Sequence, residues 1–124
     1  MNHQLIIKDI AKGSYSPIYF LHGQEPYFID LIEKFATSNI ISEAAKDFDQ
    51  TIIYGKDTEL QTVINSAKRF PMMGSHQVIS VREAQNFKNF DELINYSKKP
   101  QNQTILIFSY KGKKLDARVI KKLN

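Results

Sequence analysis

Short apolar runs alternate along the chain with stretches that repeat apolar residues at helical spacing. The runs predict four strands, over residues 18–21, 48–54, 78–81 and 104–108. Runs with few polar residues are typical of strands in a parallel sheet that is covered on both faces. Strands that alternate with helices also suit βαβ crossovers. We therefore predict an α/β fold of three layers, with a mostly parallel sheet and helices on both faces.

Three stretches between these strands predict helices with one inward face. The inward positions are Phe28, Leu31, Ile32 and Phe35, then Leu60, Val63, Ile64 and Ala67, and then Phe90, Leu93, Ile94 and Ser97. We expect Asp57 or Thr58 to cap the second helix, and Asn89 or Asp91 to begin the third, because these side chains accept hydrogen bonds from free backbone N–H groups. Pro71 should end the second helix.

Both ends of the chain also have helical character. Residues 1–12 predict either a short helix, with Leu5, Ile6 and Ile10 facing inward, or an ordered arm. Residues 115–123 predict a final helix. Because the chain ends on this helix and no second domain follows, we expect it to be a fragment of a longer protein.

The stretch after the first strand has the layout of a phosphate-binding loop without its chemistry. A strand, a turn at Gly23 and a helix follow one another, as such a loop requires. Set against G-x-x-x-x-G-K-[ST], however, residues 28–30 are Phe, Ile and Asp where Gly, Lys and Ser or Thr should stand. The turn itself offers Gln24, the acid Glu25 and then Pro26. We interpret Gly23, Gln24 and Glu25 as a degenerate, non-functional nucleotide loop.

Composition limits the class of protein. With 124 residues, of which 42% are hydrophobic, residues 1–124 can bury a core and are expected to form a single domain. The absence of cysteine excludes disulfides and thiolate metal sites. No apolar run approaches the roughly 20 residues of a membrane helix, and the start lacks a secretory signal. We expect a cytoplasmic protein without membrane contact.

Candidate catalytic and metal-binding residues are scattered. His3, His22 and His76 show no metal-ligand spacing, and no paired carboxylates suggest acid–base catalysis. We therefore predict no metal, no cofactor and no catalytic residue. Asp47 and Asp49 are interpreted as solvated or capping acids.

The net charge of +4 permits contact with nucleic acid without requiring it. Lys111, Lys113 and Lys114 are interpreted as a solvated turn, because no aromatic residues accompany them for base stacking. A basic nucleic-acid-binding domain is nevertheless one alternative. A P-loop NTPase with a divergent loop is another.

Met72 and Met73 stand between a helix-stopping proline and the turn residues Gly74 and Ser75. The residues alone leave two interpretations open, core packing and protein contact. Two adjacent side chains cannot easily both point inward from a short connection. The connection also lies at the amino ends of the strands, whereas open α/β sheets bind small ligands at the carboxyl ends. An apolar tip there suits a protein partner.

Three segments carry a resemblance to a known family. Residues 21–30 are similar to the opening strand and turn of the delta subunit of the bacterial DNA polymerase III clamp loader. Residues 70–81 resemble that family's proline segment and the valine-rich strand after it. Residues 113–118, Lys-Lys-Leu-Asp-Ala-Arg, resemble its segment after the fourth strand. The three matches occur in the right order and span nearly the whole chain.

The resemblance implies an AAA+-like N-terminal domain with a degenerate nucleotide site and the strand order 1-4-3-2. The first strand should lie at an edge, because the family's next strand would follow Asn124. The implied function is to bind the sliding clamp and help to open it during DNA replication, without ATP hydrolysis by this domain of the polymerase III holoenzyme. The implied partners are the clamp, other clamp-loader subunits through missing domains, and DNA within the complex.

The family carries its clamp contact on two hydrophobic residues after a proline, and Met72 and Met73 occupy those positions. Met73 stands where Phe is common, and residues 75–76 replace a charged pair. Both methionines should be exposed in the isolated domain, because a hot spot is buried only by its partner. Phe70 and Pro71 complete the expected clamp-binding segment and should support the loop, with Phe70 facing the core.

Overall fold

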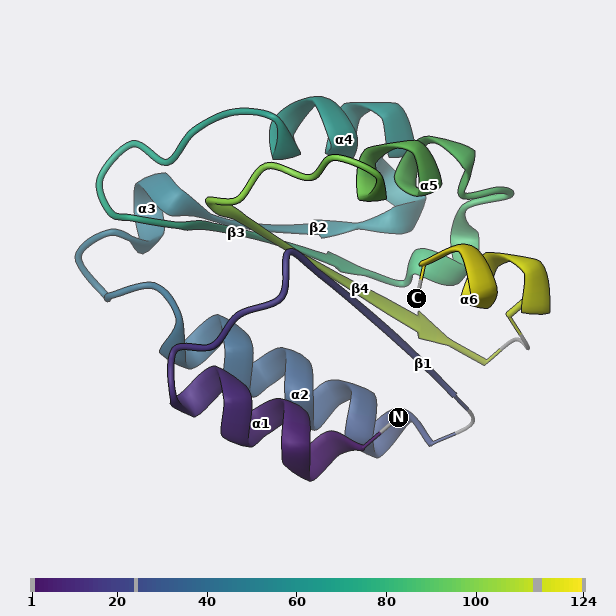
Figure 1. Ribbon diagram of the computed structural model, residues 1–124, viewed down its shortest axis with the longest axis horizontal. Helices are drawn as coiled ribbons and strands as arrows, with labels where there is room; N and C mark the ends of the chain where they lie inside the picture. The colour runs from purple at the N-terminus through teal and green to yellow at the C-terminus, as the bar shows by residue number, and fades with distance from the viewer. Residues whose placement is uncertain (1, 24, 113–114, 124) are drawn as a thin grey trace.

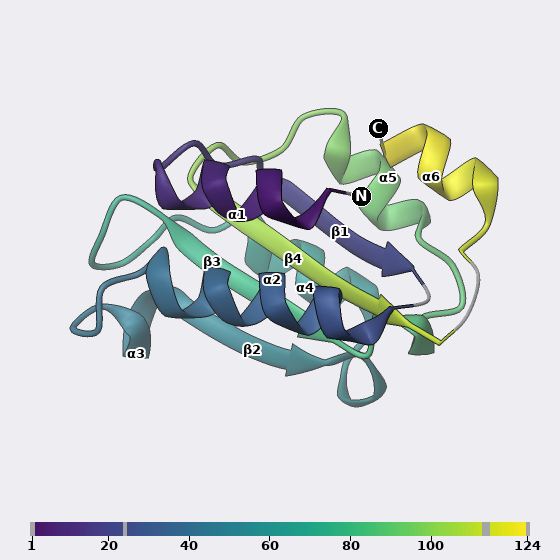
Figure 2. The same ribbon diagram turned by 90° about the horizontal axis from the view of Figure 1, so that it is seen from below.

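Four parallel strands form one sheet. A computed structural model describes residues 2–23, 25–112 and 115–123. The sheet has the order β1-β4-β3-β2, and all three strand pairings are parallel (Figure 2). The strands are β1 (Ile18–Gly23), β2 (Gln50–Tyr54), β3 (Gln77–Arg82) and β4 (Thr104–Lys111). The predicted parallel sheet, its strand order and the edge position of the first strand are confirmed.

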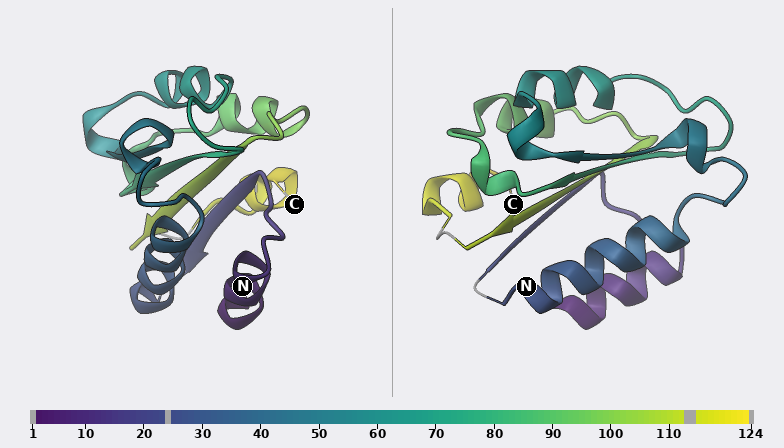
Figure 3. Two further views of the ribbon diagram at one scale, coloured as in Figure 1. Left: turned by 90° about the vertical axis from the view of Figure 1, so that its left-hand side faces the viewer. Right: turned by 180° about the vertical axis from the view of Figure 1, so that it is seen from behind.

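Helices cover both faces of this sheet (Figures 1 and 3). One face carries α1 (His3–Ala11) and α2 (Pro26–Asn39). The other carries α4 (Leu60–Ala67), α5 (Asp91–Ser97) and α6 (Ala117–Leu123). The short α3 (Lys46–Asp49) precedes β2, and two 3-10 turns, η1 (Gly55–Asp57) and η2 (Ala84–Asn86), follow β2 and β3. The predicted three-layer α/β architecture is confirmed.

The central strand β4 shows why the strands read as apolar runs. Ile105 and Ile107 pack into the core beneath α1 and α2. Leu106 and Phe108 point to the opposite face and pack into the core beneath α4, α5 and α6. Successive residues of a strand face opposite sides, so a strand covered on both sides needs apolar residues at every position.

Some helix details differ from the sequence-based expectation. Leu5 is 54% exposed and Leu31 is 36% exposed, so neither faces inward as predicted, whereas Ile10 is buried as predicted. The cap predicted for α4 at Asp57 or Thr58 is wrong, since the N-cap residue is Glu59 and its side chain makes no capping hydrogen bond. The chain first turns through η1 at Gly55, where any Cβ would collide with the carbonyl oxygen of Glu83. This close approach of two backbone segments requires glycine.

All four strands differ from their predicted ranges at one end or both. The second strand begins at Gln50 rather than Phe48, because Phe48 belongs to α3 and is exposed. The fourth strand continues beyond Phe108 to Lys111, where it pairs with the end of β1. Tyr110 in this extension is buried. The interior therefore reaches further along β4 than its apolar run indicated.

Candidate functional site

The loop between α4 and β3 exposes three large apolar side chains. It lies at the amino ends of the strands, beside α3 at the left of Figure 1. Residues 70–74 are called the Met loop below. Phe70 is 69% exposed, Met72 77% and Met73 59%. The predicted exposure of both methionines is confirmed, and core packing is excluded for them.

A buried carboxylate holds the backbone of the Met loop. Asp49, the last residue of α3, is only 2% exposed. Its Oδ1 accepts the backbone N–H of Met72 at 2.6 Å, and its Oδ2 accepts those of Met73 at 3.0 Å and Gly74 at 2.6 Å. Successive N–H groups that converge in this way form a nest for an anion. Here the anion is the protein's own Asp49 carboxylate. The interpretation of Asp49 as a solvated or capping acid is therefore wrong.

The same contacts set the charge state of this carboxyl group. Burial raises the pKa of Asp49, but the hydrogen bonds from Gly74, Met72 and Met73 together outweigh burial, and the pKa lies below its ordinary value. Asp49 is therefore ionised at neutral pH. Hydrogen bonds to an ionised acceptor are stronger than neutral ones, so the loop is anchored by charge-assisted bonds.

Phe70 does not face the core, contrary to expectation. Just before the loop, the Gln77 amide donates to the carbonyl oxygens of Ser66 and Arg69. The Thr104 hydroxyl donates to the carbonyl oxygen of Ala67 at 2.7 Å. These contacts join the end of α4 to β3 and β4 through polar groups. Phe70 is left on the surface, on the same loop as the two methionines.

The sequence contained a signal for Asp49 that residue spacing alone did not reveal. Asp49 directly precedes β2, and the Met loop precedes β3. These strands are parallel neighbours, so their amino ends lie at the same edge of the sheet. The predicted strand order therefore placed an acid next to the loop. An acid beside three free N–H groups is a natural partner for them.

The degenerate nucleotide loop lies at the opposite, carboxyl edge. Gly23 is exposed and has a φ of 140°, which only glycine adopts readily. Glu25 is the N-cap of α2 but makes no capping hydrogen bond, and Pro26 removes one N–H from the first turn. Gln24 lies outside the described residues. An acid and a proline at this helix start oppose phosphate binding.

Charged side chains near this edge neutralise one another. Buried Glu33 accepts hydrogen bonds from Arg82 Nε at 2.9 Å and from the Ser80 hydroxyl at 2.7 Å. The Glu33 carboxylate raises the pKa of Arg82. Lys111 pairs with Asp30 on α2, so its interpretation as part of a solvated turn is wrong, while Lys113 and Lys114 lie outside the described residues. The cations observed here are already paired with protein carboxylates.

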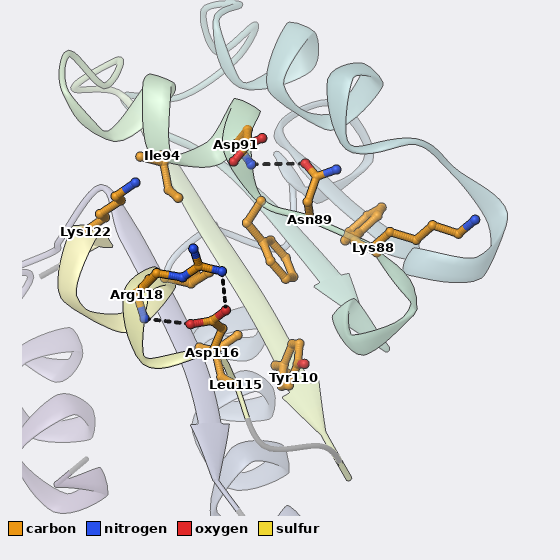
Figure 4. Close-up of a pocket in the computed structure, with 12 residues that line it drawn as sticks. Lys88, Asn89, Asp91, Ile94, Tyr110, Leu115, Asp116, Arg118 and Lys122 are labelled. Atoms are coloured by element: carbon orange, nitrogen blue, oxygen red, sulfur yellow. Dashed lines mark hydrogen bonds and ion pairs between the residues drawn. The ribbon is translucent and has the colours of Figure 1, made fainter.

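A cavity of about 320 Å³ lies between α5 and α6, near the end of β4 (Figure 4). Its wall mixes acids and bases, and Arg118 on α6 is paired with Asp116 at 3.2 Å. The main-chain N–H of Arg118 holds the pKa of Asp116 below its usual value. This cavity lies on a different part of the molecule from the Met loop.

Within residues 2–23, 25–112 and 115–123, no helix is long and apolar enough to cross a membrane. In these same ranges, no three His, Asp or Glu side chains come together as metal ligands.

Comparison with known proteins identifies the family. A model of the family described as DNA polymerase III, delta subunit, matches residues 19–124. The chain belongs to this family. The DNA polymerase III subunit delta of Bacillus subtilis (strain 168) is 27% identical over 121 residues, which is 90% of this chain and 35% of that protein. The chain thus spans about a third of the length of this relative.

Solved structures agree with the fold of the delta family. A Bacillus subtilis DNA clamp loader delta protein has a TM-score of 0.83 at 21% identity, covering 98% of this chain and 40% of that one. A Thermotoga maritima DNA polymerase III gamma subunit-related protein has a TM-score of 0.61 at 10% identity, covering 89% and 40%. At these identities the likenesses show the shared architecture.

Proposed function

We propose that this chain binds the DNA sliding clamp through Phe70, Pro71, Met72 and Met73, and that it helps to open the clamp during DNA replication. One observation carries the proposal. A member of the delta family presents two adjacent methionines, both well exposed, on a loop whose backbone a buried carboxylate holds. Large apolar side chains gathered at the surface mark binding sites for proteins.

The chemistry of the Met loop fits an apolar pocket on the partner. Methionine is flexible and polarizable, so it adapts to irregular apolar surfaces. Full burial of one Met side chain is worth about 1.5–3 kcal/mol, so two form a small hot spot. Opening then follows as a population shift, in which a protein that binds the open clamp more tightly than the closed one favours opening by that difference.

We further propose that this chain is the N-terminal domain of a longer delta subunit. The length of the matched relative supports this view, since the chain covers 35% of that protein. The remaining domains would bind the other clamp-loader subunits, and the assembled complex would contact DNA.

The direct test is replacement of both methionines, Met72→Ala with Met73→Ala. We expect clamp binding to weaken by about 2–4 kcal/mol, which is roughly 30- to 900-fold in affinity. Folding should be nearly unchanged, because exposed substitutions usually alter stability by less than about 0.5 kcal/mol. Surface plasmon resonance against the sliding clamp of the same organism measures binding, and a thermal melt measures folding.

A matched control removes two exposed apolar side chains from another surface, Leu5→Ala with Leu31→Ala. This variant should bind the clamp like the parent. Full-strength clamp binding by the methionine variant would overturn the proposal.

Calorimetric titration with ATP and Mg²⁺ addresses the NTPase alternative, since tight binding of ATP would favour it. The salt dependence of DNA affinity addresses the nucleic-acid-binding alternative.

A further inference from the structure

We infer that Asp49 is a positioning residue for clamp binding. It would fix the backbone of the Met loop in the shape that presents Met72 and Met73 to the partner. This inference rests on the proposed function and assigns to it a residue from a different element, α3, that makes the site rigid.

The geometry of the contact favours a carboxylate over other side chains. Three consecutive N–H groups, those of Met72, Met73 and Gly74, point to one side chain, and both of its oxygens are used. An ionised carboxylate only accepts hydrogen bonds and offers about four acceptor positions. The amide of asparagine would keep one oxygen but turn an NH₂ group toward the N–H groups on the other side. The contact is therefore specific for the acid.

Asp49 is itself held by the body of the domain. Its backbone N–H donates to the carbonyl oxygen of Ala45 at 2.8 Å. The next residue, Gln50, begins β2 and pairs with Val78 of β3. The Gln50 side-chain amide also donates to the carbonyl oxygen of Thr37 on α2 at 3.1 Å. The position of the carboxylate is thus fixed by α3, β2 and α2. The Met loop, which belongs to no helix or strand, is bonded to it.

A fixed backbone matters for binding because the methionines are exposed and have few contacts of their own. Ordering a loop during association reduces affinity, and a loop that is already ordered avoids this cost. The hydrogen bonds to Asp49 reach both methionines through their own N–H groups. Without these bonds, both methionine side chains should still be exposed, but the loop should present them in many orientations instead of one.

The first test compares Asp49→Asn with Asp47→Asn. Asp47 is an exposed acid two residues away, so its replacement removes the same charge without touching the loop. We expect Asp49→Asn to weaken binding to the sliding clamp about 10-fold or more, because preorganisation is lost. Asp47→Asn should stay within about 2-fold of the parent, since a lone exposed charge contributes little. Equal affinities for Asp49→Asn and the parent would overturn the inference.

A second pair of variants avoids the buried position. Gly74 is exposed, and a Cβ there would lie 3.5 Å from Asp49 Oδ2, an ordinary contact. Gly74→Ala keeps the N–H and should bind within about 2-fold of the parent. Gly74→Pro removes the N–H and should weaken clamp binding by at least about 3-fold, as one charge-assisted hydrogen bond is lost. Equal binding by both variants would count against the role of Asp49, even if Asp49→Asn failed to fold.

The third test separates this inference from the proposed function. In the Met72→Ala, Met73→Ala background, Asp49→Asn should cause no further loss of clamp affinity, because it acts through the methionines. A further loss as large as in the parent would overturn the positioning role. Unchanged clamp binding by the methionine variant alone would refute the proposed function. Loss of binding by the methionine variant, with parental binding by Asp49→Asn, would refute only the positioning role.

Hydrogen exchange measures the loop directly. The backbone amides of Met72, Met73 and Gly74 should exchange faster in Asp49→Asn than in the parent.

Discussion

Replacement of Arg82 should show how much the ion pair between Glu33 on α2 and Arg82 on β3 contributes to the free energy of unfolding. Glu33 on α2 is nearly buried and accepts hydrogen bonds from Arg82 Nε, from Arg82 Nη2 at 3.3 Å, and from the Ser80 hydroxyl. Arg82→Leu would leave the buried carboxylate with Ser80 as its remaining partner among these groups. Breaking a fully buried ion pair costs about 3–5 kcal/mol. The Arg82 side chain is 35% exposed, so water reaches the pair, and we expect a loss of about 1.5–3 kcal/mol.

The double variant Glu33→Leu, Arg82→Leu sharpens this prediction. It removes both charges, so the Ser80 hydroxyl loses Glu33 as a partner and the exposed Tyr54 hydroxyl loses its contact with Arg82 at 3.4 Å. Apolar replacement of a buried ion pair is often neutral or stabilising. We therefore expect the double variant to be more stable than Arg82→Leu alone by about 1 kcal/mol, once the cost of the unpaired hydroxyl is included.

Urea unfolding followed by circular dichroism measures both effects, as a shift of the midpoint at constant slope. Arg69→Leu is a matched control, because Arg69 is an exposed arginine, and its replacement should change stability by less than about 0.5 kcal/mol. Parental stability of Arg82→Leu would refute the assigned role of the ion pair. A double variant no more stable than Arg82→Leu would refute it equally.

Two further outcomes follow from burial and charge. Leu93→Ala, at a fully buried position of α5, should destabilise the fold by about 2–5 kcal/mol in urea unfolding, whereas Leu5→Ala at an exposed position of α1 should change it by under about 0.5 kcal/mol. Because the folded pKa of Asp49 is lowered, its contribution to stability is present at neutral pH and is lost as the pH falls below about 4. The stability difference between the parent and Asp49→Asn should thus shrink from pH 7 to pH 3, and a constant difference would contradict the lowered pKa.

Several features that local sequence determines were predicted correctly, although the cap of α4 and the inward positions of Leu5 and Leu31 were not. The strands read as apolar runs because β4 and its neighbours are covered on both faces. The inward face of α4, from Leu60 to Ala67, follows from helical spacing alone, and Leu60, Val63, Ile64 and Ala67 are all buried. The strand order came from family resemblance, since βαβ units do not determine it.

The errors at the candidate site arose where contacts between distant segments decide the structure. Asp49 and Met72 are 23 residues apart, and nothing local distinguishes Asp49 from the solvated Asp47. Phe70 was expected inside because it is a large apolar residue, yet the residues just before it are joined to β3 and β4 by polar contacts of Gln77 and Thr104, and Phe70 is exposed. Propensity and periodicity describe one segment at a time, so they do not predict contacts between segments.

The proposed clamp-binding surface and the loop that begins at Gly23 lie at opposite edges of the sheet. The Met loop enters β3 at its amino end, whereas Gly23 ends β1 at the carboxyl edge. Six residues of strand correspond to about 20 Å, and the core between the edges is continuous. The Asp49 carboxylate and the end of α4 hold the Met loop without any residue from the carboxyl edge. The geometry of the proposed clamp-binding surface therefore does not depend on an intact phosphate-binding loop.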